Sequence, residues 1–270
     1  QSLPQAIQTM LDPAECGPAC LSLCQDVQGE TFEYPEEFFK ERIHNIRRPR
    51  PDDFQIKQAV EKIKNSKKPI IISGGGVFYS DAMDELGNFA VKHNIPVTQT
   101  VMGYSTMKKD HSHFVGPIGG LGGKAANNLA KETDLAICIG TKLADFTTGS
   151  WANFENPEFK LVSINIARHD ANKHLAEAVI GDAKVTLTEL SNAIGDWKSS
   201  DSWHKKSQVE LKSWNEYVDK ESGPTNQELP SYAHAVGAIY RNSDPTDIAV
   251  TAAGGLVGEV VQVWRPKELN

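Results

Sequence analysis

The sequence predicts an α/β protein built on a doubly wound parallel sheet. From residue 54 onward, segments with strand character alternate with segments that have helical spacing of apolar residues. Each predicted strand is almost entirely apolar, as expected where helices cover both faces of a parallel sheet. Glycines or polar residues follow the strands, where such sheets place their ligands.

The elements follow from the local pattern in chain order. Apolar residues recur at helical spacing between Ile56 and Ile63 and predict a helix, which the apolar run Pro69–Ser73 follows as the first strand. A second helix is expected from residue 80 to about 93. The later elements are expected strands at 95–98, 134–140, 160–165 and 178–180, and expected helices at 124–133 and 182–194.

The two flanks are organised differently. Residues 18–27 form an apolar run that predicts an isolated strand, and the prolines and charges of residues 47–53 predict a linker. After residue 196 the sequence predicts a polar helix at 202–221. A second α/β pattern then begins, with a helix at 232–240, a strand at 248–252 and a glycine turn at 252–255.

Composition and charge exclude several classes of partner. The 270 residues are 39% hydrophobic and 23% charged, which allows a large buried core in one or two domains. A net charge of −7 argues against binding to nucleic acid or to an anionic membrane surface. The sequence offers neither a long apolar span nor a signal-peptide pattern, so we expect a cytoplasmic protein.

The cysteines and histidines do not form a recognisable metal motif. Cys16, Cys20 and Cys24 would align on a helix, but a proline within the run prevents one, and buried thiols are the simpler expectation. His111 and His113 flank a serine without a nearby third ligand, so solvated or capping roles are expected for them. No metal ligand and no catalytic residue is assigned.

The glycines at residues 74–76 raise the possibility of a nucleotide site. They fit the first two glycines of a dinucleotide fingerprint, but the third position is Tyr79. Three carboxylates, Asp81, Asp84 and Glu85, crowd the next helix start and would repel a pyrophosphate. The second strand also ends without the acid that would hold a ribose. A tight strand-to-helix turn is therefore the preferred interpretation.

A second glycine-rich loop, residues 116–128, is similar to a phosphate loop. Lys124 is followed by Ala125, where a serine or threonine would hold magnesium, and Ile118 stands at the first glycine position. A nucleotide-hydrolysing loop is therefore not expected, although contact with a ligand stays open. The turns at 140–149 and 165–174 carry polar residues that could cap helices or touch a ligand.

Taken in order, these turns are similar to a known family. The segments VMGYSTMKKDHSHFVGPIGGLGGKAANNLAKETDLAICIGTKLADFTTG and AVIGDAKVTLTEL resemble the middle domain of thiamine diphosphate enzymes of the acetolactate synthase type. GPACLSLCQDVQ resembles the last strand of that family's pyrimidine-binding domain. The resemblance implies a six-stranded middle sheet with partial flanking domains.

The resemblance also implies a division of the chain. Residues 1–30 would be the end of the pyrimidine-binding domain, 31–53 a linker, and 54–196 the central Rossmann-like domain. Residues 197–228 would be a linker helix and 229–270 the start of the diphosphate-binding domain. The family's activating glutamate would lie before Gln1 and its metal motif after Asn270, so we expect a fragment that is inactive alone.

Cofactor expectations follow from the same resemblance. Thiamine diphosphate and magnesium are implied for the full-length parent. The diphosphate-binding residues in this chain would be Ala253, Gly254, Gly255 and Leu256. Relatives that hold FAD commonly end the fourth middle-domain strand in acids, whereas this chain has Asn165, so FAD is not expected.

Three functions remain open. DPAECGP, INIARHDANKH and AAGGLVGE resemble members that hydrolyse a C–C bond of a cyclic dione, which implies such a small-molecule substrate. The alternatives are an acetolactate synthase-like enzyme and a non-catalytic nucleotide-binding module of the same fold. The family places its active site between subunits, so a homo-oligomer is also expected.

Overall fold

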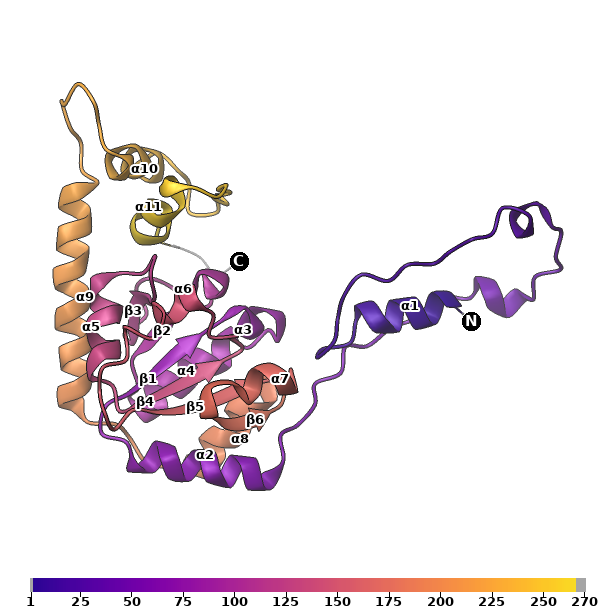
Figure 1. Ribbon diagram of the computed structural model, residues 1–270, viewed down its shortest axis with the longest axis horizontal. Coiled ribbons are helices and arrows are strands. Elements are labelled where there is room, and N and C mark those ends of the chain that lie inside the picture. Colours follow the sequence, from indigo (N-terminus) through magenta and orange to yellow (C-terminus); the bar gives the residue numbers. More distant parts are fainter. Residues whose placement is uncertain (1, 266–270) are drawn as a thin grey trace. The chain divides into compact units, whose positions relative to one another are not determined.

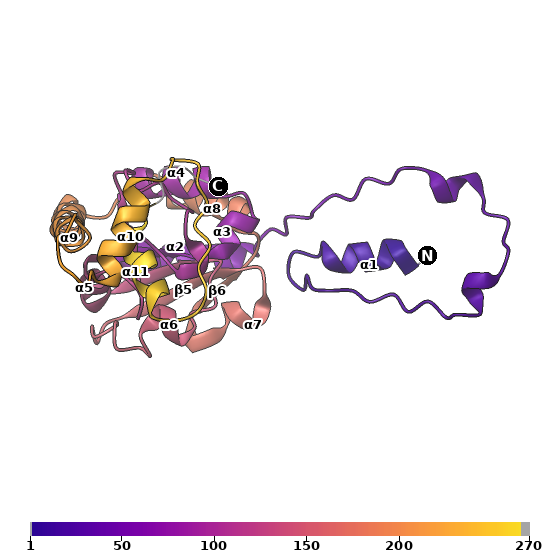
Figure 2. The same ribbon diagram turned by 90° about the horizontal axis from the view of Figure 1, so that it is seen from above.

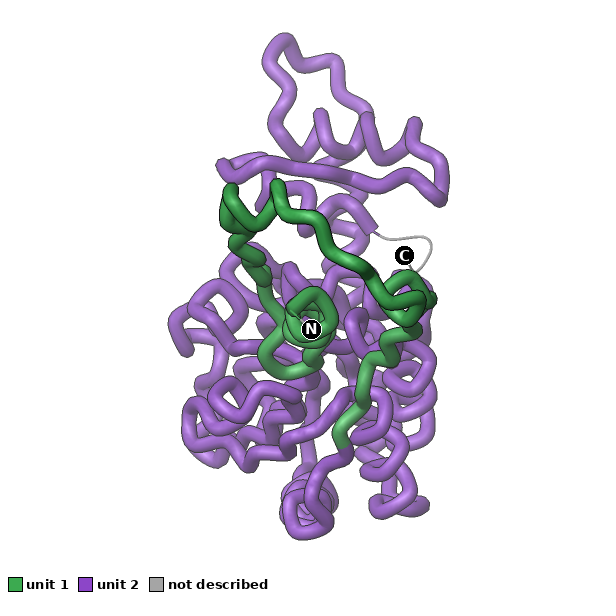
Figure 3. Tube along the Cα trace, turned by 90° about the vertical axis from the view of Figure 1, so that its right-hand side faces the viewer, with its two compact units in different colours: residues 1–49 green, residues 50–270 purple. Residues whose placement is uncertain are grey.

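The protein is described here by a computed structural model that covers residues 2–265. The chain divides into two compact units, residues 1–49 and residues 50–270 (Figure 3). The first unit contains helix α1 (Ser2–Met10) and two short 3-10 helices, Val27–Gly29 and Glu36–Phe39. The second unit contains the sheet and the remaining helices.

The strand predicted at residues 18–27 is wrong. No strand occurs among the described residues of the first unit, and Leu21 and Leu23 are exposed. A strand needs a neighbour for its backbone N–H and C=O groups, and nothing within residues 2–49 supplies one. The expectation of buried thiols fails for the same reason: Cys16, Cys20 and Cys24 are exposed.

The second unit is built on a six-stranded, fully parallel sheet, which confirms the predicted fold class. The strand order is β3-β2-β1-β4-β5-β6, so the chain reverses direction across the sheet between β1 and β4. The strands are β1 (Pro69–Ser73), β2 (Val97–Gln99), β3 (Phe114–Pro117), β4 (Leu135–Ile139), β5 (Lys160–Asn165) and β6 (Glu177–Ile180).

Ten helices accompany the sheet in the described part of this unit (Figure 1). Four begin with a side-chain cap: the carboxylates of Asp52 and Asp182 and the hydroxyls of Ser200 and Ser231 accept backbone N–H groups of the first turn. The helices are α2 (Asp53–Asn65), α3 (Gly75–Tyr79), α4 (Met83–His93), α5 (Lys124–Glu132), α6 (Asp145–Thr148), α7 (Arg168–Ala171), α8 (Ala183–Ile194), α9 (Asp201–Glu221), α10 (Tyr232–Arg241) and α11 (Gly255–Val263).

The core lies on both faces of the sheet because successive residues of each strand point to opposite sides. On β1, Ile71 belongs to the cluster beneath α2, α4 and α8, whereas Ile70 and Ile72 belong to the cluster beneath α5 and α9. β4 alternates in the same way. The two layers explain why these strands are apolar throughout.

Three elements differ from the sequence prediction. No strand is predicted at residues 114–117, because Gly116 and Pro117 suggest a turn. The structure nevertheless contains β3 there, and it pairs in parallel with β2. The helix expected from residue 80 to about 93 is present as α4, which starts at Met83, and a further short helix, α3, lies within the predicted glycine turn before it. The strand expected at 248–252 is absent, and Ile248 and Val250 are exposed, because no strand of the described residues lies beside them.

Helix α9 carries the chain from one end of the sheet to the other. It starts beside the amino end of β1 and runs along the face covered by α5 (Figure 1). α10 and α11 follow over the carboxyl edge of the sheet (Figure 2). Val218, Val236 and Val263, one from each of these three helices, form a small separate core.

Candidate functional site

The crevice at the carboxyl edge between β1 and β4 is closed by contact between two turns. The amide N–H of Gly76 donates to the carbonyl oxygen of Gly140 at 2.9 Å. A Cβ added to Gly74 would lie 2.4 Å from that same oxygen, and one added to Gly76 would lie 2.6 Å from the Cα of Gly140. The glycines therefore allow backbone to pack on backbone, which supports the tight-turn interpretation.

The end of β5 is engaged in a similar way. The side-chain amide of Asn165 donates to the carbonyl oxygen of Thr141 at 3.1 Å, and its oxygen accepts the N–H of Ala167 at 3.0 Å. The nitrogen thus joins this turn to the turn after β4, and the oxygen closes the turn of Asn165 itself. The end of β5 therefore offers no carboxylate to a ribose, unlike the acids expected at this position in relatives that hold FAD.

The glycine-rich loop before α5 is closed by its own helix. The N–H of Gly119 donates to Asn127 Oδ1 at 2.9 Å, and Asn127 Nδ2 donates back to the carbonyl oxygen of Gly119 at 3.0 Å. The N–H of Gly120 donates to the carbonyl oxygen of Phe146. Those N–H groups are therefore not directed at a ligand.

The four residues assigned to the diphosphate site lie together at the start of α11. Ala253, Gly254, Gly255 and Leu256 are exposed, and the first turn of this nine-residue helix has no side-chain cap. Gly254 has φ of +137°, a conformation that favours glycine, and nothing lies within 4 Å of its missing Cβ. The turn presents backbone N–H groups in an open setting, as an anion contact requires.

A cavity of about 280 Å³ lies beside this helix and was not foreseen from the sequence. Tyr104, Tyr240, Ile248 and Val257 are among its lining residues. Tyr104 is anchored by its hydroxyl, which donates to the carbonyl oxygen of Val261 at 3.4 Å, and burial raises its pKa. The lining is mostly apolar, and only the pairing of distant segments creates it.

The histidines are structural in this arrangement. His113 is buried, hydrogen-bonded to Asn94 at 3.2 Å, and stacked on His204 with ring centroids 4.2 Å apart. Burial lowers the pKa of His113 to about 4, and His204 and His111 reinforce this effect. Among the described residues no three His, Cys, Asp or Glu side chains are grouped as metal ligands would be.

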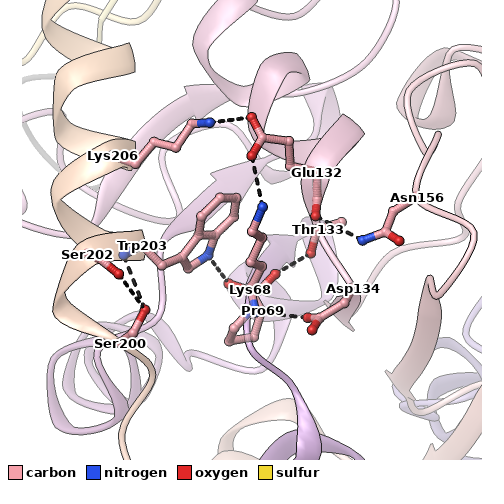
Figure 4. Close-up of polar contacts among 10 residues, drawn as sticks. All are labelled: Lys68, Pro69, Glu132, Thr133, Asp134, Asn156, Ser200, Ser202, Trp203 and Lys206. Atoms are coloured by element: carbon pink, nitrogen blue, oxygen red, sulfur yellow. Dashed lines mark hydrogen bonds and ion pairs between the residues drawn. The ribbon is translucent and has the colours of Figure 1, made fainter.

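The densest polar network of the unit lies at the opposite, amino edge of the sheet (Figure 4). Glu132 pairs with Lys68 at 3.0 Å and with Lys206 on α9, and the hydrogen bond from Lys206 lowers the pKa of Glu132. The Lys68 ammonium lies 5.6 Å from the centre of the Trp203 ring. This network fixes α9 and has no free pair of groups for chemistry.

The sheet topology and the closed glycine turns define a doubly wound α/β domain whose own crevice is filled. Residues 56–190 match the family described as "Thiamine pyrophosphate enzyme, central domain", and the chain belongs to it. The prediction made from the order of the turns is confirmed.

Several individual enzymes are similar to nearly the whole of this chain. The chain is 37% identical over 282 residues to the 3D-(3,5/4)-trihydroxycyclohexane-1,2-dione hydrolase of Clostridium perfringens (strain 13 / Type A), covering 96% of this chain and 44% of that protein. The enzymes of that name from Clostridium botulinum (strain Alaska E43 / Type E3) and Bacillus licheniformis are 37% and 36% identical, covering 98% and 100% of this chain and 45% and 46% of theirs. The chain thus spans about half the length of the curated relatives it matches.

Within residues 2–265, none of the helices combines the length and apolar character that crossing a bilayer requires.

Proposed function

We propose that this chain supplies the central part of a thiamine diphosphate-dependent hydrolase. The enzyme would cleave a C–C ring bond of 3D-(3,5/4)-trihydroxycyclohexane-1,2-dione and give 5-deoxy-glucuronate, a step of inositol breakdown. The observation that carries the proposal is the 36–37% identity to hydrolases of that name over 96–100% of this chain. The similarity extends beyond the shared central domain into both flanks.

We assign each segment of the chain to a domain of the enzyme, using the boundaries expected from the sequence. Residues 54–196 would hold two cofactor-binding domains apart, with residues 1–30 belonging to the pyrimidine-binding domain and 229–270 to the diphosphate-binding domain. Residues 31–53 and 197–228 would be the connections. The central sheet suits a spacing role, since its own crevice is filled by the contact of Gly76 with Gly140.

The residues present fit part of a thiamine diphosphate site. The open N–H groups of residues 253–256 at the start of α11 suit a diphosphate oxygen, which the helix dipole also favours. Thiamine diphosphate, when bound, supplies a nucleophilic carbon for attack on a carbonyl group. This turn would orient the diphosphate and perform no proton transfer. Magnesium would be held by groups other than the described residues, among which no ligand cluster occurs.

We propose a homo-oligomer in the cytoplasm as the working state. Support comes from large apolar side chains that are exposed on the short helices between the strands of the sheet. These side chains are Phe78, Tyr79, Met102, Phe146 and Leu175. Neither nucleic acid nor membrane is proposed as a partner of this acidic chain.

Two alternatives stay distinguishable by experiment. An acetolactate synthase-like enzyme would condense pyruvate, and a non-catalytic module would bind a nucleotide without turnover. The test uses the complete polypeptide that contains this chain, whose mass should exceed twice that of the chain. Conversion of the cyclic dione that depends on added thiamine diphosphate and magnesium is expected. Acetolactate formation from pyruvate without dione hydrolysis would contradict the proposal.

A further inference from the structure

A small cavity of about 20 Å³ lies between the end of β2, helix α9 and helix α11. Its polar lining comes from all three elements. Gln99 ends β2, Asn215 belongs to α9, and Gln262 belongs to α11, with Arg265 two residues after that helix ends. The cavity therefore lies inside the contact through which α11 is held against the sheet.

Gln99 is the unusual residue of this cavity. Its side chain is only 1% exposed, and neither its amide oxygen nor its amide nitrogen has a hydrogen-bond partner among the described residues. Its backbone carbonyl oxygen is engaged, since it accepts the N–H of Ile118 at 2.9 Å. A buried polar group left unpaired is costly, so both amide atoms call for a partner inside the cavity.

Arg265 presents a matching donor. One of its terminal nitrogens donates to Asn215 Oδ1 at 3.4 Å and the other pairs with Asp219. The remaining donor, Nε, is buried and has no partner among residues 2–265. Other polar atoms around the cavity are engaged elsewhere: Tyr104 donates to Val261, and Gln262 Nε2 lies 3.5 Å from the carbonyl oxygen of Leu121.

We propose that this cavity is a binding site for one ordered water molecule that joins Gln99 to Arg265. About 10–15 Å³ is enough for a single water, and a stable buried water needs two to four polar partners. The water accepts the N–H groups of Arg265 Nε and Gln99 Nε2 and donates to Gln99 Oε1. The site is too small for a polyatomic anion such as phosphate.

The water gives Gln99 a positioning role for α11. It completes a polar link from the end of β2 to Arg265, two residues after the helix ends, beside the hydrogen bond from Tyr104 to Val261. The inference stands independently of the proposed enzymatic function, because it rests on burial, cavity size and unpaired atoms within this chain.

The direct test is a crystal structure of the unmodified chain at a resolution that shows ordered water, with a second crystal soaked in bromide. A water within hydrogen-bond distance of both Gln99 and Arg265 Nε is expected. The proposal is overturned by an unfilled cavity, by a direct bond between the two side chains, or by bromide at the site, which would identify an anion instead.

A pair of variants tests the same site in solution. Gln99→Met keeps the length of the side chain but removes its hydrogen bonds, so it should lower the thermal midpoint and speed amide exchange in α11 several-fold. Thr186→Val is the matched control: Thr186 is also buried with an unpaired hydroxyl, but it does not line this cavity. The control should leave exchange in α11 unchanged. A Gln99→Met midpoint equal to or above that of the parent chain would overturn the proposal.

Discussion

The indole N–H of Trp203 donates to the carbonyl oxygen of Pro69 at 2.9 Å, joining the first turn of α9 to the first residue of β1. Trp203 is 3% exposed and belongs to the core cluster of its face of the sheet. The two residues are 134 positions apart. This contact and the Glu132 network fix where α9 starts.

Trp203→Phe should reduce stability because it removes this hydrogen bond and leaves the buried carbonyl oxygen of Pro69 without it. The expected loss in the free energy of unfolding is about 1–3 kcal/mol, measured by urea denaturation. Trp151→Phe is the control, since the Trp151 indole has no hydrogen-bond partner among the described residues. Equal losses in the two variants would contradict a specific role for the contact with Pro69.

Gly76→Ala should destabilise the chain, because its new Cβ would lie 2.6 Å from the Cα of Gly140 and the two turns would have to separate. A loss of about 1–3 kcal/mol is expected from such overpacking. Gly120→Ala should be tolerated, since its nearest contact would be 3.8 Å. A Gly76→Ala chain as stable as the parent would show that the crevice between β1 and β4 is open.

Stability should fall in mild acid because of His113. Its folded pKa, about 4, lies below its ordinary value of 6.5, so the unfolded chain takes up a proton first. This contribution is therefore constant above pH 6.5 and is lost as the pH falls from 6.5 toward 4. Burial lowers the pKa of His93, His111 and His204 as well.

Urea midpoints measured from pH 7.5 to pH 4.5 check this expectation. His113→Gln should flatten the dependence between pH 6.5 and 4.5, at some cost in stability at neutral pH. His169→Gln, at an exposed histidine of α7, is the matched control for replacing a histidine as such. An unaltered slope in His113→Gln would mean that other groups dominate the acid response.

The isolated chain should bind neither thiamine diphosphate nor FAD tightly. It presents only the turn at residues 253–256 toward a diphosphate, and Asn165 replaces the acid expected of an FAD site. Isothermal titration calorimetry with magnesium present should give no heat of binding at micromolar concentrations. Micromolar affinity for thiamine diphosphate would require additional binding groups within this chain.

Limited proteolysis should cut the first unit and the linker near residues 47–53 before the second unit. Residues 199–206, which lead from the connection after α8 into α9, should resist early cleavage. Ser199 is buried and its N–H donates to the carbonyl oxygen of His93 at 2.9 Å, and Trp203 is anchored to β1. Mass spectrometry should therefore find early cuts before α2 and none at residues 199–206. Early cutting between residues 69 and 140 would contradict the domain assignment.

The central sheet could be predicted because β1 and β4 are almost entirely apolar, a pattern that indicates burial on both faces of the sheet. β3 could not, since Gly116 and Pro117 have low strand propensity and only pairing with β2 makes them a strand. For residues 18–27 the opposite happened: a strand was predicted and none is present. Their apolar pattern gives strand propensity but supplies no partner strand.

The site was predictable only in part. The turn at residues 253–256 was assigned to a diphosphate through the family resemblance and stays a prediction; the structure shows these residues exposed at the start of α11. Gln99 and Arg265, in contrast, meet at a cavity formed by three elements distant in sequence. Local patterns carry no information about such contacts, because they depend on how the helices dock.

Helix α9 also sets an angular relation between the two ends of the second unit. Its 21 residues advance about 30 Å, and each residue turns the helix by about 100°. A single-residue insertion in the middle of α9 would leave the Trp203 anchor in place but rotate Val218, and with it α10 and α11, away from their present heading. Loops of this protein can change length, whereas α9 can change length only by whole turns.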